Sequence, residues 1–511
     1  MRKGFDRTAA LVTGFALLTR AAHLAGYLAG KHSALYYWPV LAAERYRTEA
    51  AGLVSGLKVQ GGFAFADPAY PYILALSILT GAGAWPVFAL QLASSVAIAW
   101  MVFRLALTAG SSRIAAVVAS LAWSLYAPAS FYDLTMLSVT LSTLAVTSIV
   151  LLATGPGAGS TGALATSGML SGMLAGLRPQ MLPLALIPLR SGLRRSSVAA
   201  VVSAGAVAIP LLLLSWQQNA RGGPFSPLAS STGLNLYLGN NPDADGFSPA
   251  VPSAGISEDL RRDIHEAARE FAAARGFRTP GEADRFFLSL ALDYISAHPG
   301  RTAHLMLVKW AAFFGFRPFD SYYEMGRVNR FSPVFNLGPP RWLYICMFAA
   351  GLGAFLLEGR HRVVLLAPVV LSLLADILFL HTERYTLPAL PAMCAVAAAG
   401  LSMTTRAVLA GKARRSALPL AFGAILLLPS ILFPVPRIPD CLYYQSLAVR
   451  AYQMGEYDLS LELFERSAAA SPLGSTVWVL SHYEAARIAS ALGDADRAHQ
   501  HEIILESNRS Q

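Results

Sequence analysis

Two carboxylates of the chain are candidates for taking a proton from a substrate. Glu44 belongs to the charged stretch LAAERYRTEA (41–50), and Asp67 stands directly before Pro-Ala-Tyr-Pro (68–71). Both follow the first long apolar segment of the chain. A carboxylate within hydrogen-bond reach of a hydroxyl can act as a general base. The residue types therefore suggest proton transfer, with either side chain as the acceptor.

Three basic side chains could bind a phosphate group. Arg178 and Arg384 lie near the ends of apolar segments, and Lys309 lies in an amphipathic segment. The planar guanidinium of arginine matches phosphate oxygens, and a positioned cation stabilises negative charge on a leaving group. A structural interpretation stays open for each. Basic residues at span ends commonly extend to the interface, and a lysine on an amphipathic helix can simply be solvated.

The composition indicates that a membrane surrounds these residues. Of the 511 residues, 55% are hydrophobic and 14% are charged, whereas a soluble protein carries about 25% charged residues. The apolar residues form blocks long enough for a span of about 20 residues. We therefore predict an all-α fold, a polytopic bundle of membrane helices. The net charge of +10 does not indicate nucleic acid, because the basic residues cluster in short connectors, as orientation signals do.

Eleven spans and one orientation are predicted from the hydropathy and the charge. The spans are expected at about 8–28, 85–108, 113–130, 133–153, 162–177, 179–190, 197–216, 340–357, 362–380, 385–405 and 416–434. The positive-inside rule places the N-terminus in the cytoplasm. Two large segments, 30–84 and 217–339, then lie outside, and so does the tail after 435. A membrane domain over 1–435 and a tail over 436–511 are expected.

Two surface helices are expected in the first outer segment. In the charged stretch and beyond it, Tyr46, Ala50, Leu53 and Leu57 fall on one helical face. Such a helix can lie on the outer membrane surface with its charges directed outward. The following stretch ADPAYPYILALSILTG begins with prolines and ends with glycine. It is too short to span comfortably, so a second surface helix is predicted.

The tail has the spacing of a helix-turn-helix repeat. The matching positions are Leu447, Ala448, Ala451, Gly455, Tyr457, Leu461, Phe464 and Pro472. This pattern is typical of a tetratricopeptide repeat, and HYEAARIASALGDADRAH resembles part of a second copy with Gly493 at the turn. Because three repeats are usually needed for a free-standing array, the tail is expected to pack on the membrane domain or on a protein partner.

Several motifs, in this order, resemble the GT-C glycosyltransferases. They are the charged helix after the first span, Pro-x-Tyr-Pro, GLRP (176–179), GLNLYLGNNPDADG (233–246), HPGRTAHLMLVKWAAFF (298–314) and ERYTLPALP (383–391). More narrowly, the chain is similar to bacterial enzymes of the family 39/83 type, which are related to protein O-mannosyltransferases and aminoarabinose transferases. The resemblance covers nearly the whole chain.

The resemblance implies a reaction and a set of site residues. A sugar on a polyprenyl phosphate would be transferred, with inversion, to an acceptor at the outer face of a bacterial inner membrane. The family's catalytic Asp lies four residues before Tyr46, where this chain has Ala42, so Glu44 or Asp67 is expected to replace it. Donor phosphate binding is expected from Arg178, Lys309 and Arg384, and a substrate loop from Tyr46, Tyr70, Asn240, Asn241 and Tyr385.

Other interpretations stay open. The missing Asp at Ala42 leaves room for an inactive scaffold that acts through its tail. A glycan ligase or polymerase would share the many spans, and a transporter would show two related halves and charges at mid-membrane depth. The acceptor is open among glycan, lipid and protein. No protein metal site is predicted, because NPDADG lacks the terminal Glu of a calcium loop, and no cofactor is assigned, although the need for a divalent cation is open.

Overall fold

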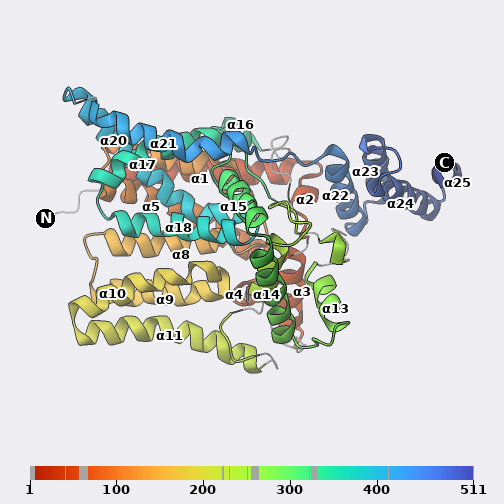
Figure 1. Ribbon diagram of the computed structural model, residues 1–511, viewed down its shortest axis with the longest axis horizontal. Helices are drawn as coiled ribbons and strands as arrows, with labels where there is room; N and C mark the ends of the chain where they lie inside the picture. The colour runs from red at the N-terminus through yellow and green to blue at the C-terminus, as the bar shows by residue number, and fades with distance from the viewer. Residues whose placement is uncertain are drawn as a thin grey trace.

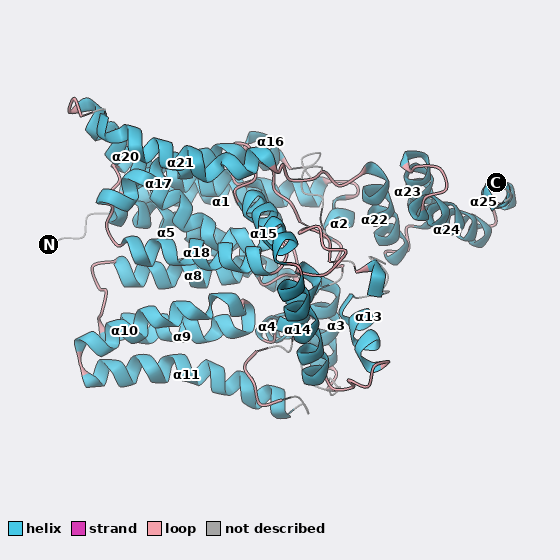
Figure 2. Cartoon of the chain, viewed as in Figure 1, coloured by secondary structure: helices cyan, strands magenta, loops and turns pink. Residues whose placement is uncertain are grey.

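The chain folds into α-helices, as predicted. The computed structural model describes residues 6–40, 42–56, 67–220, 224–228, 231–249, 251–254, 264–320, 323, 332–412 and 414–509. These residues form α-helices and short 3-10 helices and no β-strand (Figure 2). Leu57, one of the four positions expected on the first surface helix, lies outside the described residues.

Among the residues that the structure describes, five helical segments are long and apolar enough to cross a membrane. They are α1 (Arg7–Ala29), α5 (Trp85–Ala109), α11 (Ser197–Ala220), α17 (Arg341–Glu358) and the continuous run Glu383–Leu409, which ends in α20 (Leu390–Leu409). Their lengths run from 18 to 27 residues, which matches the 17–25 residues, or somewhat more with tilt, that a span requires. The chain thus has the composition and helix lengths of a membrane protein.

The remaining predicted spans correspond to further helices packed beside these five. These are α6 (Arg113–Leu125), α8 (Val139–Thr154), α9 (Thr161–Leu177), α10 (Leu186–Arg195), α18 (Arg362–Leu378) and α21 (Arg414–Leu432). The segment 179–190 is divided between the 3-10 helix η1 (Pro179–Ala185) and the first part of α10, because Pro183 interrupts regular α-helical hydrogen bonding. Figure 1 shows α8, α9, α18 and α21 roughly parallel to the long axis of the molecule.

Basic connectors gather at the end of the bundle that carries the N-terminus. At the start of α6, Arg113 donates a 3.0 Å hydrogen bond to the Thr8 hydroxyl and pairs with Asp6. Near the end of α20, Arg406 donates a 2.7 Å bond to the Gly110 carbonyl, just after α5. The predicted outer segments and the tail lie at the opposite end (Figure 1). We call these two ends the basic end and the loop end.

Charged side chains inside the bundle are paired. Arg20 of α1 is 2% exposed, and its Nε lies 2.7 Å from the Asp133 carboxylate. Arg20 also donates to the Ser124 carbonyl and the Ser130 hydroxyl. A charge in apolar surroundings is costly unless it is paired and hydrogen-bonded, so this network fixes α1 against the segment before α8.

The loop end consists of short helices. Those from the first outer segment are α2 (Ser33–Tyr37), α3 (Ala42–Val54) and α4 (Ala69–Leu79). The second segment adds α12 (Thr232–Gly239), α13 (Ile264–Ala273), α14 (Pro280–Ala297), α15 (Pro299–Phe313) and α16 (Pro333–Leu337). The two helices predicted in the first segment are therefore present as α3 and α4, but Tyr46 and Ala50 of α3 and Tyr70 of α4 are buried in the core of the protein and do not lie on a membrane surface.

The tail consists of two helix hairpins. They are α22 (Asp440–Gln453) with α23 (Tyr457–Ala470), and α24 (Thr476–Leu492) with α25 (Ala495–Arg509). Gly455 and Gly493 have φ values of 80° and 82°, which glycine adopts without steric cost, so both hairpins turn where the sequence predicts. The Trp38 indole, just after α2, donates a 3.0 Å hydrogen bond to Gln453 of α22. The tail therefore packs on the loop end, as expected.

Candidate functional site

Asp67 is the carboxylate held at the loop end between helices. It lies directly before α4 and is partly buried. Its Oδ2 accepts a 2.8 Å hydrogen bond from the Tyr46 hydroxyl of α3 and a 3.2 Å bond from the Ser138 hydroxyl, which precedes α8. Three segments far apart in the sequence thus meet at one carboxylate. A carboxylate has more lone pairs than these two hydrogen bonds use, so it can in principle accept a further proton.

The apolar face of α3 brings Tyr46 to this position. Tyr46 and Ala50 are 5% and 0% exposed, four residues apart on one helical face. This face packs against α4 and the bundle rather than lying on a lipid surface. The rings of Tyr46 and Tyr70 lie 5.3 Å apart, and the Tyr70 hydroxyl donates to Gln91 of α5. Tyr70 therefore anchors α4 and supports Tyr46.

Two guanidinium groups act on the Asp67 carboxylate. Burial raises the pKa of Asp67 above its usual value, and the nearby positive charge of Arg178 is the largest opposing influence on that pKa. The hydrogen bonds from Tyr46 and Ser138 and the charge of Arg45 also oppose the rise in pKa. A raised pKa suits a general base, because it increases the affinity of the carboxylate for a proton.

Arg178 lies at the point where α9 ends. It is the C-cap residue of α9, directly before Pro179, and it is 7% exposed. Its guanidinium carbon lies 5.5 Å from the centre of the Tyr385 ring, a distance at which a cation is attracted to an aromatic face. Its buried Nε has no hydrogen-bond partner among the described residues. A guanidinium in this setting can accept an anionic ligand.

Arg384 is tied to a neighbouring carboxylate. Its Nε lies 3.0 Å from Oδ2 of Asp320, which is 1% exposed. The same oxygen accepts hydrogen bonds from the Tyr132 hydroxyl at 2.6 Å and the Thr382 hydroxyl at 3.1 Å. These contacts fix α19 (Glu383–Thr386), which also carries Tyr385. Arg384 therefore orients the segment that places the Tyr385 ring beneath Arg178.

Glu44 lies on a different face of α3 from Tyr46. Its carboxylate pairs with Arg47 at 2.6 Å, and the side chains of the pair are 36% and 48% exposed. The helix turns about 200° over the two residues between Glu44 and Tyr46, so the two side chains point in opposite directions. Of the two candidate carboxylates, Asp67 alone contacts Tyr46 and Ser138 in the structure.

Lys309, Asn240 and Asn241 join the second outer segment to the bundle. The Lys309 ammonium donates to the carbonyls of Gly239 at 2.8 Å and Ile377 at 3.3 Å, and the side chain is 0% exposed. Asn240 donates to the Leu378 carbonyl, and Asn241 donates back to its own helix, α12. These contacts hold α12 against the end of α18. The structure thus gives these three residues a bracing role and does not bring them to Asp67 by any contact it describes.

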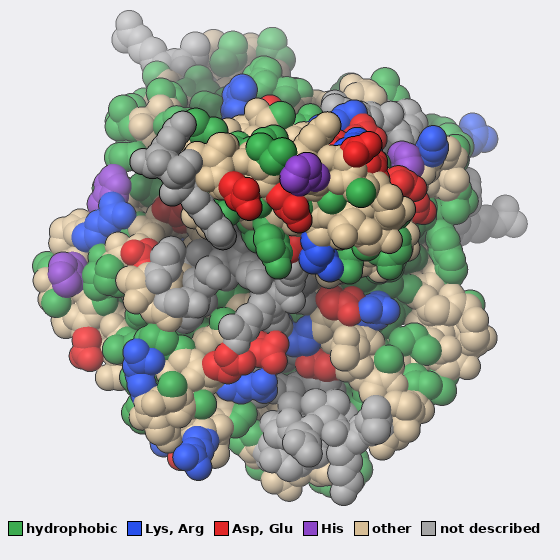
Figure 3. Space-filling model, turned by 90° about the vertical axis from the view of Figure 1, so that its right-hand side faces the viewer, with side chains coloured by type: hydrophobic (Ala, Val, Ile, Leu, Met, Phe, Trp, Pro, Cys, Tyr) green, Lys and Arg blue, Asp and Glu red, His purple; other side chains and the backbone are tan. Residues whose placement is uncertain are grey.

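Figure 3 shows the loop end from outside, with acidic and basic side chains near one another on its surface. Within the described ranges, no three His, Cys, Asp or Glu side chains come together as a group that could hold a metal ion. The arrangement around Asp67 instead combines a hydrogen-bonded carboxylate with guanidinium groups. Such a site can take a proton and bind an anion.

Ser138, Arg45 and Asp320 belong to this site and were not predicted from the sequence. Ser138 and Asp320 lie in segments with no recognisable motif, and their roles depend on contacts with residues 71 and 64 positions away. Arg45 lies in the charged stretch 41–50, of which only the carboxylate and the apolar face were used to predict the site from the sequence. Its sequence position beside Tyr46 was the one available signal.

Comparisons of the chain with protein-family models, with curated protein sequences and with solved structures find no match.

Proposed function

We propose that the protein is a membrane glycosyltransferase that uses a sugar on a polyprenyl phosphate. The observation that carries the proposal is the meeting of Asp67, Tyr46 and Arg178 at the loop end. These residues come from segments that the GT-C resemblance marks separately along the sequence, namely the first outer segment and GLRP, and Tyr385 adds a third from ERYTLP. Their convergence supports one site, at the end of helices that are apolar enough to contact lipid.

Asp67 is the general base in this proposal. It takes the proton of an acceptor hydroxyl as the hydroxyl oxygen bonds to the anomeric carbon of the donor sugar. The bond from that carbon to the phosphate oxygen breaks on the opposite side, its electron pair leaves with the lipid phosphate, and the configuration inverts. The Tyr46 and Ser138 hydroxyls orient the carboxylate by donating to it. A general base typically contributes a factor of about 10² to 10⁴ in rate.

Arg178 binds the phosphate of the donor. Its Nε donor has no partner among the described residues and its guanidinium lies near the Tyr385 ring, so Arg178 is the candidate cation that we assign to the departing phosphate. Because the stabilising group is positioned before the reaction, little reorganisation is required when charge develops. The lipid donor itself supplies the activated bond, so no nucleotide is needed at this face.

The proposal includes the topology expected from the sequence. The basic end faces the cytoplasm of a bacterial cell, the loop end faces the periplasm, and the further helices complete the eleven spans of the GT-C type with tilt or local thinning of the bilayer. The tail is then a periplasmic tetratricopeptide-like unit that recruits a protein partner or the acceptor. The acceptor's class, glycan, lipid or protein, follows from the experiment below.

Membranes that carry the full chain test this function. Polyprenyl-phosphate sugars labelled in the sugar are added, and label is followed from the lipid to water-soluble, lipid and protein fractions. We expect label to leave the polyprenyl phosphate only where the chain is present. Donor binding without any release of label would instead support the scaffold interpretation, and uptake of intact donor into vesicles would support a transporter.

A further inference from the structure

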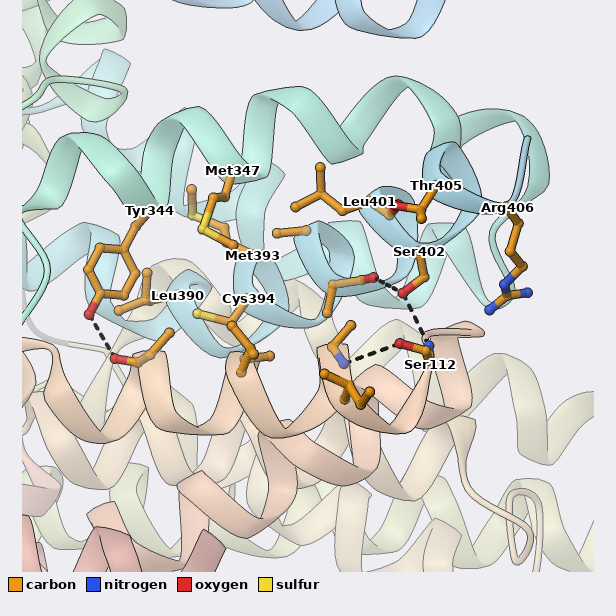
Figure 4. Close-up of a pocket in the computed structure, with 17 residues that line it drawn as sticks. Ser112, Tyr344, Met347, Leu390, Met393, Cys394, Leu401, Ser402, Thr405 and Arg406 are labelled. Carbon is orange, nitrogen blue, oxygen red and sulfur yellow. Dashed lines mark hydrogen bonds between the residues drawn. The ribbon is translucent and has the colours of Figure 1, made fainter. Parts of the chain in front are cut away.

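A groove on the side of the bundle lies outside the proposed reaction. It runs between α6, α17 and α20 and encloses about 320 Å³. Figure 4 shows Tyr344 and Leu390 at one end of the groove and Ser112, Ser402 and Arg406 at the other. The end with Ser112 and Arg406 is the basic end of the bundle, so the groove opens far along the helices from Asp67.

The lining of the groove is apolar along most of its length. The apolar lining residues between the two ends include Ile114, Ala115, Val118, Met347, Met393 and Leu401. On its rim, Ile114 is 79% exposed and Val118 is 45% exposed. Apolar side chains exposed on the flank of a membrane-type bundle face hydrocarbon, so the groove opens sideways to lipid tails.

The groove is at least as long as one leaflet of a bilayer. It extends from Ser112 to Ala122 along α6 and from Leu390 to Arg406 along α20, which is about 15 Å and about 24 Å at the 1.5 Å rise of an α-helix. The hydrocarbon core of a bilayer is about 30 Å thick, so one leaflet is about half of this. An acyl chain lying in the groove would therefore bring its headgroup to the level of Ser112 and Arg406.

The polar end of the groove is electropositive. Arg406 donates one hydrogen bond, to the Gly110 carbonyl, and a guanidinium has five N–H donors in all. Ser112 caps α6 by accepting from the Ala115 amide at 3.2 Å, so the positive end of the helix dipole lies at the same place. The Ser112 amide in turn donates to the Ser402 hydroxyl at 3.1 Å, which holds α6 and α20 together there.

We propose that this groove binds the acyl chain of an anionic phospholipid, whose phosphate lies against Arg406 and the start of α6. The apolar length selects a single hydrocarbon chain, and the basic end selects a negative headgroup over a neutral one. Binding at this position fills the space between α6, α17 and α20 and stabilises the bundle from its lipid-facing side.

Lipid exchange on the purified full chain tests the proposal. The protein in neutral detergent is supplied with phosphatidylglycerol or with phosphatidylcholine of the same acyl chains, and retained lipid is counted by native mass spectrometry. We expect retention of phosphatidylglycerol, reduced about fivefold in Arg406→Gln, since a basic residue near a membrane surface contributes about 1 kcal/mol toward anionic lipid.

Matched variants locate the lipid. Ala115→Phe fills the groove, and Val118→Trp covers it from its exposed rim; both should abolish retention while the variants keep their thermal unfolding transitions. Arg360→Gln removes an exposed charge at the same end outside the groove and should leave retention unchanged. Equal retention of the two lipids, or unchanged retention in both groove variants, would overturn the proposal. So would full displacement by polyprenyl phosphate, which would make the groove a donor site.

Discussion

The hydroxyl of Tyr46 donates a 2.8 Å hydrogen bond to the carboxylate of Asp67, although 21 positions separate the two residues. This bond joins α3, the charged helix, to the segment that begins α4. It also favours the ionised carboxylate, because a donated hydrogen bond stabilises the charged form of an acid. The relationship sets the proton affinity of the group that we propose as the base.

In Tyr46→Phe, the fall of the transfer rate on the acidic side of the pH–rate profile should occur at a higher pH than in the wild type. Burial already raises the pKa of Asp67, and the Tyr46 hydroxyl opposes this rise. Removing the hydroxyl raises the pKa further, because the charged form of the carboxyl group loses a donated hydrogen bond. Because the ionised carboxylate is the active form, the rate at low pH falls. Rates measured from pH 4 to pH 9 check this.

Tyr70→Phe is the control for that shift. Its hydroxyl donates to Gln91 and not to Asp67, so the fall of the rate on the acidic side should stay where it is in the wild type. Equal shifts in the two variants would show that loosening of the tyrosine pair, and not the hydrogen bond, changes the profile.

Arg178→Gln should weaken both donor binding and transfer. The variant removes the cation beside Asp67 and the contact with the Tyr385 ring. Loss of one positioned group that stabilises charge in the transition state typically lowers the rate about 10² to 10³ fold. Arg178→Lys should recover only part of this, because an ammonium lacks the planar fork. Full activity in Arg178→Gln would exclude Arg178 from phosphate binding.

Lys309→Met should change how stability depends on pH. Burial lowers the pKa of Lys309 to about 7, from a usual value of 10.5. Between these two pH values the unfolded chain binds more protons than the folded chain, so rising pH favours the folded state of the wild type. The methionine variant lacks this gain. Thermal unfolding midpoints are measured for both proteins from pH 6 to pH 10. The midpoint of the wild type should rise with pH relative to that of the variant. The same pH dependence in both proteins would contradict this prediction.

Arg450→Ala should loosen the tail from the loop end. Arg450 of α22 is 3% exposed, donates a 3.4 Å hydrogen bond to the Tyr36 carbonyl and lies 5.1 Å from the centre of the Tyr323 ring. Losing buried hydrogen bonds from a charged group costs about 1.5–3 kcal/mol. Hydrogen exchange in α2 and α22 should therefore speed up about tenfold or more. Arg466→Ala, which breaks an exposed pair with Glu462, should change exchange there little.

Periodicity and composition predicted an all-helical fold, but not the helices α13 and α14 of the second outer segment or the division of 179–190 between η1 and α10. The spacing of Tyr46 and Ala50 gave the inward face of α3, and prolines with a following glycine gave α4. Turn glycines gave both hairpins of the tail. Periodicity could not predict which part of the protein packs against the apolar face of a helix. The apolar side of α3 packs on α4 and the bundle, a tertiary contact that a local pattern does not encode.

Some residues of the candidate site could be predicted from the sequence and others could not. Asp67, Arg178 and Tyr385 could be named because each lies next to a short motif. Ser138 and Asp320 could not, because a single hydroxyl or carboxylate becomes informative only when folding brings it to its partner. Lys309 and Asn240 were predicted from sequence motifs, but the structure does not bring them to Asp67 by any contact it describes. Their motif is present, and the structure uses it to brace α12 against α18.

The most direct test of the account compares Asp67→Asn with Glu44→Gln in the labelled-donor assay. The two variants neutralise carboxylates of the same outer segment, one hydrogen-bonded to Tyr46 and one exposed beside Arg47. We predict that Asp67→Asn lowers the rate of sugar release about 10² to 10⁴ fold, while donor binding is retained and Glu44→Gln stays near the wild-type rate. Collapse of transfer in Glu44→Gln with normal transfer in Asp67→Asn would contradict the assignment of the base.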